Sequence, residues 1–139
     1  MKRWWHEHVH GLPTRALLPV DYDPKRRHPL LISLHGSTER GSDNVAPLTH
    51  GVTGFEHDPL GRFGAIVVAP QAPRAQPCCG CRYGGETSTQ PALMALTHEL
   101  VLRDSVDSER VDLVGFSMGA IGLWDIKRCR CSQVTPARH

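Results

Sequence analysis

Residues 110–121 read Arg110-Val111-Asp112-Leu113-Val114-Gly115-Phe116-Ser117-Met118-Gly119-Ala120-Ile121. The first half is β-prone and mostly apolar, which predicts a buried strand, and the second half begins a run with helical spacing. Between the halves, glycines stand two residues before and two residues after Ser117. A sharp strand-to-helix turn is crowded and requires small residues at these two places. The stretch therefore predicts a strand, a tight turn with Ser117 at its apex, and a helix.

Ser117 on such a turn is a candidate nucleophile. The turn holds the hydroxyl clear of the backbone, and a neighbouring base must take its proton before it can attack. The amide of Met118, at the start of the helix, would point at the negative charge that develops on an attacked carbonyl oxygen. The alternative interpretation is a tight turn whose glycines serve packing only.

The rest of the chain fits an α/β fold. Apolar runs at 15–19, 29–35 and 64–70 predict further strands, and nearly continuous apolar runs are typical of strands buried on both faces of a parallel sheet. Leucines at helical spacing follow Pro91 and predict a helix that ends near Arg103. Strand, helix and strand in this order indicate a mostly parallel sheet with flanking helices.

A second motif follows the strand predicted at 29–35. It reads Leu34-His35-Gly36-Ser37-Thr38-Glu39-Arg40-Gly41-Ser42-Asp43-Asn44. A site that stabilises an oxyanion needs a second amide from the loop after a neighbouring strand, and Ser37 is the candidate donor. Asp43 or Asn44 is expected to cap the next helix. A His-Gly step alone indicates only a turn, so the motif gains its significance from the Ser117 turn.

The motifs together resemble a known family. They are Pro19-x-x-Tyr22-Asp23-Pro24, residues 29–44, Ala69-Pro70-Gln71, and Val106-Asp107-x-x-Arg110-Val111 leading into the Ser117 turn. Over roughly residues 15–127 the chain resembles the serine esterases of the phospholipase/carboxylesterase and polyhydroxyalkanoate-depolymerase-like branch of the α/β-hydrolases, some of which are described as predicted peptidases.

The resemblance implies a serine hydrolase of the carboxylesterase type that acts on ester or thioester bonds of small molecules through an acyl-serine intermediate. It matches Ser117 to the nucleophile, Met118 to the first oxyanion amide and Ser37 to the second. It implies no cofactor and no metal.

The chain departs from this family after Ser117. The fold orders its triad as serine, acid, histidine, and here only Asp125 and His139 follow the serine. Asp125 falls on the predicted helix and His139 is the last residue, so neither suits a triad. We therefore expect residues 1–127 to form the N-terminal portion of an α/β-hydrolase fold with its C-terminal strands missing, and residues 128–139 to form an irregular tail.

Two further expectations follow from that departure. The alternative function is a non-catalytic truncated remnant that lacks the triad acid and base. The strand before Ser117 would also form an exposed edge of the sheet, through which the chain is expected to self-associate.

Composition excludes several classes of partner. The chain has 139 residues, a net charge of +2 and 40% hydrophobic residues, so neither a nucleic acid nor an acidic membrane is expected as a partner. No apolar run is long enough to span a membrane. The basic start of the chain lacks the apolar stretch of a secretory leader, and the number of cysteines is odd, at five. Both observations favour a cytoplasmic protein with reduced thiols.

Two constellations favour a third function, a small thiol-rich metal-binding module. One is formed by Cys78, Cys79, Cys81, Cys129 and Cys131, a possible zinc set. The other is His6, His8 and His10, which would share one face of a strand. We expect free thiols and a solvated strand face instead.

Overall fold

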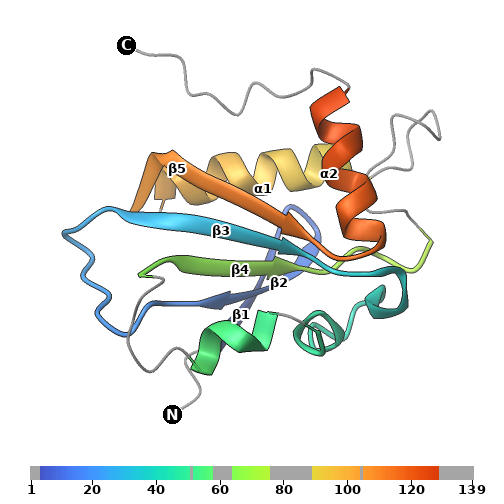
Figure 1. Ribbon diagram of the computed structural model, residues 1–139, viewed down its shortest axis with the longest axis horizontal. Helices are drawn as coiled ribbons and strands as arrows, with labels where there is room; N and C mark the ends of the chain where they lie inside the picture. The colour runs from blue at the N-terminus through green and yellow to red at the C-terminus, as the bar shows by residue number, and fades with distance from the viewer. Residues whose placement is uncertain (1–3, 51, 58–63, 76–88, 104, 129–139) are drawn as a thin grey trace.

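The computed structural model describes residues 4–50, 52–57, 64–75, 89–103 and 105–128, which form one five-stranded sheet with two α-helices on one face (Figure 1). The strands are β1 (Trp4–Val9), β2 (Leu12–Leu17), β3 (His28–Leu34), β4 (Ile66–Pro70) and β5 (Val106–Gly115). The helices are α1 (Gln90–Arg103) and α2 (Met118–Arg128), with short 3-10 helices η1 (Ser37–Glu39), η2 (Ala46–Leu48) and η3 (Val52–His57). The predicted α/β class is confirmed.

The sheet is mixed, in the order β1-β2-β4-β3-β5. β4, β3 and β5 run parallel, as the continuous apolar runs predicted, whereas β2 is antiparallel to both β1 and β4. The β1–β2 hairpin turns at His10 and Gly11, whose φ angles are positive. The sequence predicted a short strand at 15–19 and a solvated strand face at His6, His8 and His10, but it did not predict that the two strands pair as a hairpin.

Buried apolar side chains lie on both faces of the sheet. On one face, alternate residues of β3 (Leu30, Ile32 and Leu34) pack with the buried leucines of α1. On the other face, Val52 of η3 packs with Val67 of β4. This second face is covered by short 3-10 helices rather than by long helices (Figure 1).

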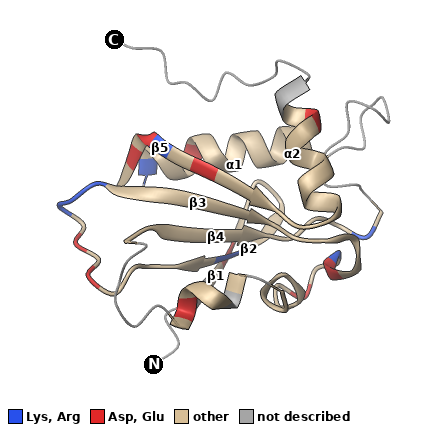
Figure 2. Cartoon of the chain, viewed as in Figure 1, with Lys and Arg blue, Asp and Glu red and all other residues tan. Residues whose placement is uncertain are grey.

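β5 begins earlier than the strand predicted at 110–116. It pairs with β3 at Val106, loses register, and pairs regularly only from Val111 to Gly115. Within the irregular part, Arg110 Nε donates to Asp107 Oδ2 at 2.7 Å. Basic and acidic residues stand together there and in the loop before β3, at the end of the sheet far from Ser117 (Figure 2). Among the described helices, none is both long and apolar enough to cross a membrane.

Candidate active site

Ser117 lies on the turn between β5 and α2, as predicted (Figure 1). Its φ angle is +51°, in the left-handed region that residues other than glycine seldom adopt. A Cβ at Gly115 would lie 2.6 Å from the amide nitrogen of Ala120, which is closer than van der Waals contact allows. β5 and the first turn of α2 therefore meet too closely for any side chain at this position.

Gly119 brings α2 directly onto the end of β3. A Cβ there would lie 2.7 Å from the carbonyl carbon of Leu34 and 2.9 Å from the carbonyl oxygen of His35. The amide of Phe116 also donates to the Leu34 carbonyl oxygen at 3.0 Å. The small residues around Ser117 thus hold the serine turn against the loop that follows β3.

The loop after β3 carries the second predicted amide. Ser37 is the first residue of η1 and is exposed, and Met118 is the first residue of α2. A Cβ at Gly36 would lie 3.2 Å from a ring carbon of Phe116, so this loop and the serine turn are in contact. The structure places Ser117, Met118 and Ser37 just after the C-terminal ends of the parallel strands β3 and β5. Their chemical roles stay predictions.

A buried glutamine holds this loop in place. Gln71, fully buried after β4, donates from Nε2 to the Glu39 carbonyl oxygen and to Asp43 Oδ1, each at 2.9 Å. Its Oε1 accepts from the Asn44 amide at 2.7 Å. Asp43 Oδ1 also accepts from the amides of Val45 and Ala46 at the start of η2, whose N-cap position is held by Val45 rather than by Asp43 or Asn44 as predicted. Sequence reasoning assigned Gln71 no role, although a polar residue directly after a buried strand was the available signal.

His35 is buried and has both ring nitrogens engaged. Nδ1 lies 2.6 Å from the Gly36 carbonyl oxygen, and Nε2 lies 2.9 Å from the Ala72 amide, which donates to it. The ring is therefore neutral with its proton on Nδ1. Burial lowers the pKa of His35 below its ordinary value, against the effect of the Gly36 hydrogen bond. His35 supports the loop after β3 and is not available as a base for Ser117.

We expect His35 to make folding stability depend on pH. As the pH falls through about 6.5, His35 takes up a proton more readily in the unfolded chain than in the folded one, so protons favour unfolding. Between about pH 7.5 and about pH 5.5, the wild type should lose more stability than His35→Gln, which cannot titrate. Urea unfolding at both pH values measures this, and equal losses would contradict the prediction.

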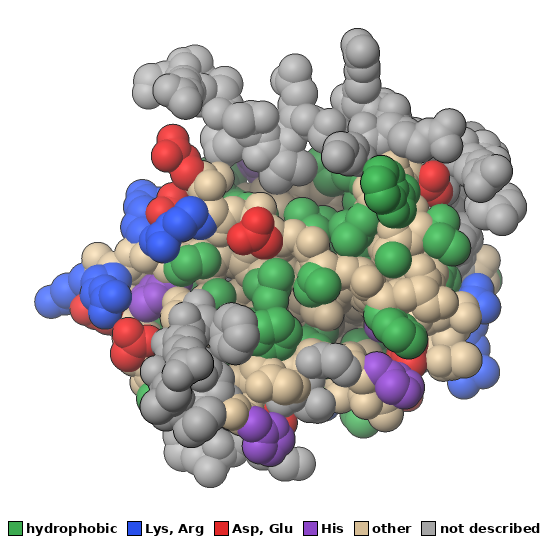
Figure 3. Space-filling model, viewed as in Figure 1, with side chains coloured by type: hydrophobic (Ala, Val, Ile, Leu, Met, Phe, Trp, Pro, Cys, Tyr) green, Lys and Arg blue, Asp and Glu red, His purple; other side chains and the backbone are tan. Residues whose placement is uncertain are grey.

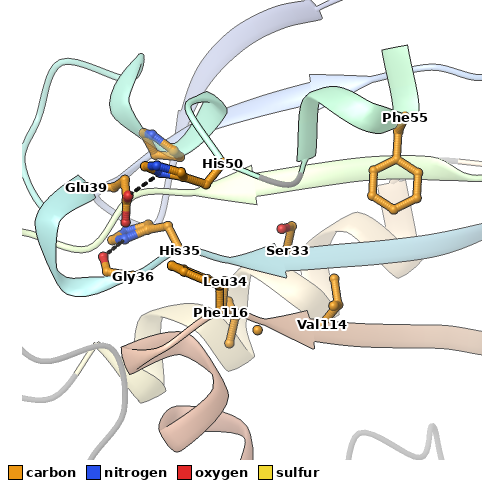
Figure 4. A pocket seen from close by; sticks show the side chains of 11 residues that line it. Ser33, Leu34, His35, Gly36, Glu39, His50, Phe55, Val114 and Phe116 are labelled. Atoms are coloured by element: carbon orange, nitrogen blue, oxygen red, sulfur yellow. Dashed lines mark hydrogen bonds and ion pairs between the residues drawn. The ribbon is translucent and has the colours of Figure 1, made fainter. Parts of the chain in front are cut away.

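A cavity of about 500 Å³ opens beside the serine turn, on the sheet face opposite α1 and α2 (Figure 4). Its walls are mostly apolar, and they include Pro47, Phe55, Val114 and Phe116. Glu39 and His50 form its polar end, where Glu39 Oε1 lies 2.6 Å from His50 Nδ1 (Figure 4). Burial raises the pKa of Glu39, but hydrogen bonds from Thr38 and His50 outweigh it and hold the pKa below its usual range.

Sequence reasoning found no convincing acid–histidine pair near Ser117, and it did not consider the pair that the structure shows. Asp125 lies on α2, the helix on which the sequence placed it, and is buried. His139 lies outside the described residues. Nothing in the sequence indicated that the segments carrying Glu39 and His50 lie close together. The His50 ring also stacks on Phe116, with ring centroids 6.0 Å apart.

The metal constellations find no support in the described part of the chain, where no cluster of potential ligands was found. His6 and His8 are exposed on β1, and His10 pairs with Glu99 of α1 at 2.8 Å instead. The five cysteines and the tail from 129 onward lie outside the described residues.

Comparison with known proteins is informative at the level of structure alone. No protein-family profile and no curated protein sequence matches the chain. A thermostable esterase of known structure superposes with a TM-score of 0.76 and 25% identity, over 88% of this chain and 36% of the esterase. The dipeptidyl peptidase 4 of Porphyromonas gingivalis gives a TM-score of 0.57 at 17% identity, over 90% of this chain and 18% of the peptidase. A 2,6-dihydroxy-pseudo-oxynicotine hydrolase also gives 0.57, at 15% identity, over 94% and 34% of the two chains.

The chain has an α/β-hydrolase fold. This confirms the superfamily that the Ser117 turn and the loop at 34–44 indicated. The chain spans about a third of the length of the thermostable esterase.

Proposed function

We propose that the chain is a serine hydrolase of the carboxylesterase type, with Ser117 as the nucleophile that forms an acyl intermediate with an ester or thioester substrate. The observation that carries the proposal is the strained backbone at Ser117, with φ of +51°, held between the α2 N-terminus and the loop after β3. Strain of this kind costs free energy and persists where function needs it. The thermostable esterase that superposes on this chain supports the same chemistry.

The roles within the reaction follow from the placement of the residues. The Ser117 hydroxyl attacks the ester carbonyl carbon, and the carbonyl oxygen gains a negative charge. The amides of Met118 and Ser37, at the starts of α2 and η1, donate to this oxygen. The serine proton passes to the leaving oxygen or sulfur, the alcohol or thiol departs, and water then releases the acid from the serine. Within the superfamily, the proposal favours the phospholipase/carboxylesterase and polyhydroxyalkanoate-depolymerase-like branch, whose motifs the sequence resembles.

A fluorophosphonate probe tests the nucleophile, because it reacts only with an activated serine. We expect the chain to be labelled at Ser117 and the Ser117→Ala variant not to be labelled. Mass spectrometry of the labelled peptide identifies the modified residue. Absence of labelling in a folded wild type would reject the proposed function.

Replacement of Ser37 by proline tests the second oxyanion amide. Proline removes the N–H, and the extended backbone of Gly36 (φ −78°, ψ 177°) is compatible with a following proline. The labelling rate should fall about 10²- to 10³-fold, as on loss of one oxyanion donor. Ser37→Ala keeps the amide and should label at nearly the wild-type rate. Equal rates for both variants would show that another amide serves the oxyanion.

A non-catalytic chain is the second candidate function. Its support is that no described histidine hydrogen-bonds the Ser117 hydroxyl, and that both nitrogens of nearby His35 are engaged. Without a base, the oxyanion amides alone leave an acceleration of only about 10³-fold over water. Hydrolysis of a p-nitrophenyl ester separates the candidates. A slow rate that Ser117→Ala leaves unchanged supports the non-catalytic chain, and a fast rate that depends on Ser117 supports the hydrolase.

A further inference from the structure

One oxygen of the buried Glu39 carboxylate has no hydrogen-bond partner. Glu39 is only 3% exposed. Its Oε1 accepts from the Thr38 hydroxyl at 3.1 Å and pairs with His50, whereas Oε2 is buried and unpaired among the described residues. Buried polar atoms nearly always have a partner, because an unpaired one has lost water without replacement. A ligand that donates a hydrogen bond would satisfy this oxygen.

The unpaired oxygen lies at the end of the cavity next to the reaction site. Oε2 would be 2.9 Å from a Cβ at Gly36, and the same point is 3.2 Å from a ring carbon of Phe116. Gly36 immediately precedes the candidate oxyanion amide of Ser37, and Phe116 immediately precedes Ser117. A ligand group bound to Oε2 would therefore lie between the loop after β3 and the serine turn.

The rest of the cavity is suited to an apolar chain. Val114 of β5 and Phe55 of η3 line it away from the polar end, and Figure 4 shows the side chains of Glu39 and His50 at one end and that of Phe55 at the other. Its volume of about 500 Å³ lies in the range of small-molecule sites. The cavity thus has a polar neck beside the serine turn and an apolar body.

We propose that this cavity binds the acyl part of the substrate and selects acyl groups with a hydroxyl on the carbon beside the carbonyl, whose O–H donates to Glu39 Oε2. The inference rests on the function proposed above. An ionised carboxylate only accepts hydrogen bonds, so a donor on the substrate is the complementary group. The hydrogen bonds from Thr38 and His50 favour the ionised form and fix the orientation of the carboxylate. An acyl chain without the hydroxyl would leave Oε2 unpaired and bind less tightly.

Binding to the Ser117→Ala variant tests the selectivity without hydrolysis. Isothermal titration calorimetry compares methyl 2-hydroxyhexanoate with methyl hexanoate, both of which are neutral. The hydroxy ester should bind about 10- to 100-fold more tightly, as for a hydrogen bond to a charged group. Addition of Glu39→Gln should reduce the ratio to about one, because its amide nitrogen replaces Oε2 while its oxygen keeps Thr38 and His50 as partners. Glu109→Gln, the same change at an exposed position on β5, should keep the wild-type ratio.

Three results would overturn the inference. They are equal affinity for the two esters, no binding of either ester, and a preference that survives Glu39→Gln. Circular dichroism of each variant shows whether it is folded. Fluorophosphonate labelling separates this inference from the proposed function. Labelling at Ser117 without a preference rejects the acyl selectivity alone, and a Glu39-dependent preference without labelling rejects the nucleophile alone.

Discussion

Gly119→Ala should destabilise the fold by about 3–5 kcal/mol, a large part of the about 5–15 kcal/mol that stabilises a typical domain. The added methyl group would overlap the carbonyl group of Leu34 and approach the carbonyl oxygen of His35 to 2.9 Å. Neither can move independently, because both belong to the backbone at the end of β3. The helix start must shift away from the sheet, and labelling of Ser117 should be lost with it.

Urea unfolding followed by circular dichroism measures the effect of Gly119→Ala. Gly54→Ala is the matched control, because a Cβ at this exposed glycine of η3 would meet nothing within 4 Å. The control should unfold within a few tenths of a kcal/mol of the wild type. If Gly119→Ala unfolds at the same urea concentration as Gly54→Ala, the close contact between α2 and β3 is wrong.

The serine turn could be predicted because its requirements are local. Gly115 and Gly119 are needed by contacts within the turn and with the adjacent strand, and the strand and helix patterns on either side are continuous in the sequence. The ends of α1 were predicted for the same reason, since Pro91 and the leucine spacing mark them. The predictions that the structure confirmed are therefore those in which one short stretch of sequence contains both the pattern and the contacts that require it.

The polar contacts that support the site depend on segments distant in the sequence. Gln71 bonds residues about thirty positions earlier, at 39, 43 and 44. His50 reaches Glu39 only because η1 and η2 fold over the end of β3. A glutamine after a strand and a histidine in a loop are common, and their partners become visible only once the strand order is known. The β1–β2 hairpin was not predicted for a similar reason. β2 belongs to the sheet because it pairs with β4, and that pairing is not visible in the sequence.

Val114→Lys should convert a self-associating chain into a monomer. The interaction that we propose is between two copies through β5, which lies at the end of the strand order and pairs with β3 alone among the described strands. The irregular pairing and charged residues between Val106 and Val111 protect the first half of this edge. Among the residues that the structure describes, no such protection covers the regular half from Val111 to Gly115.

Exposed apolar residues gather beside this unprotected half. Val114 is 43% exposed and Phe116 is 60% exposed, and α2 adds Ile121 at 57% and Trp124 at 65%. Figure 3 shows hydrophobic side chains over β5 and α2 on the viewed face. An open strand edge with apolar neighbours favours pairing with a second strand, and a second copy supplies an identical edge for an antiparallel, two-fold contact.

Sedimentation velocity over a range of protein concentrations tests this contact. Each copy would bring a lysine to the shared edge, and the cost of burying and crowding like charges there is several kcal/mol, so the dissociation constant should rise about 100-fold or more. Val20→Lys is the matched control: the same residue is 67% exposed in the segment between β2 and β3, and its replacement should leave association unchanged. Association through β5 requires that only the first variant becomes monomeric. A wild type that is monomeric throughout, or two variants that behave alike, would show that the β5 edge does not mediate association.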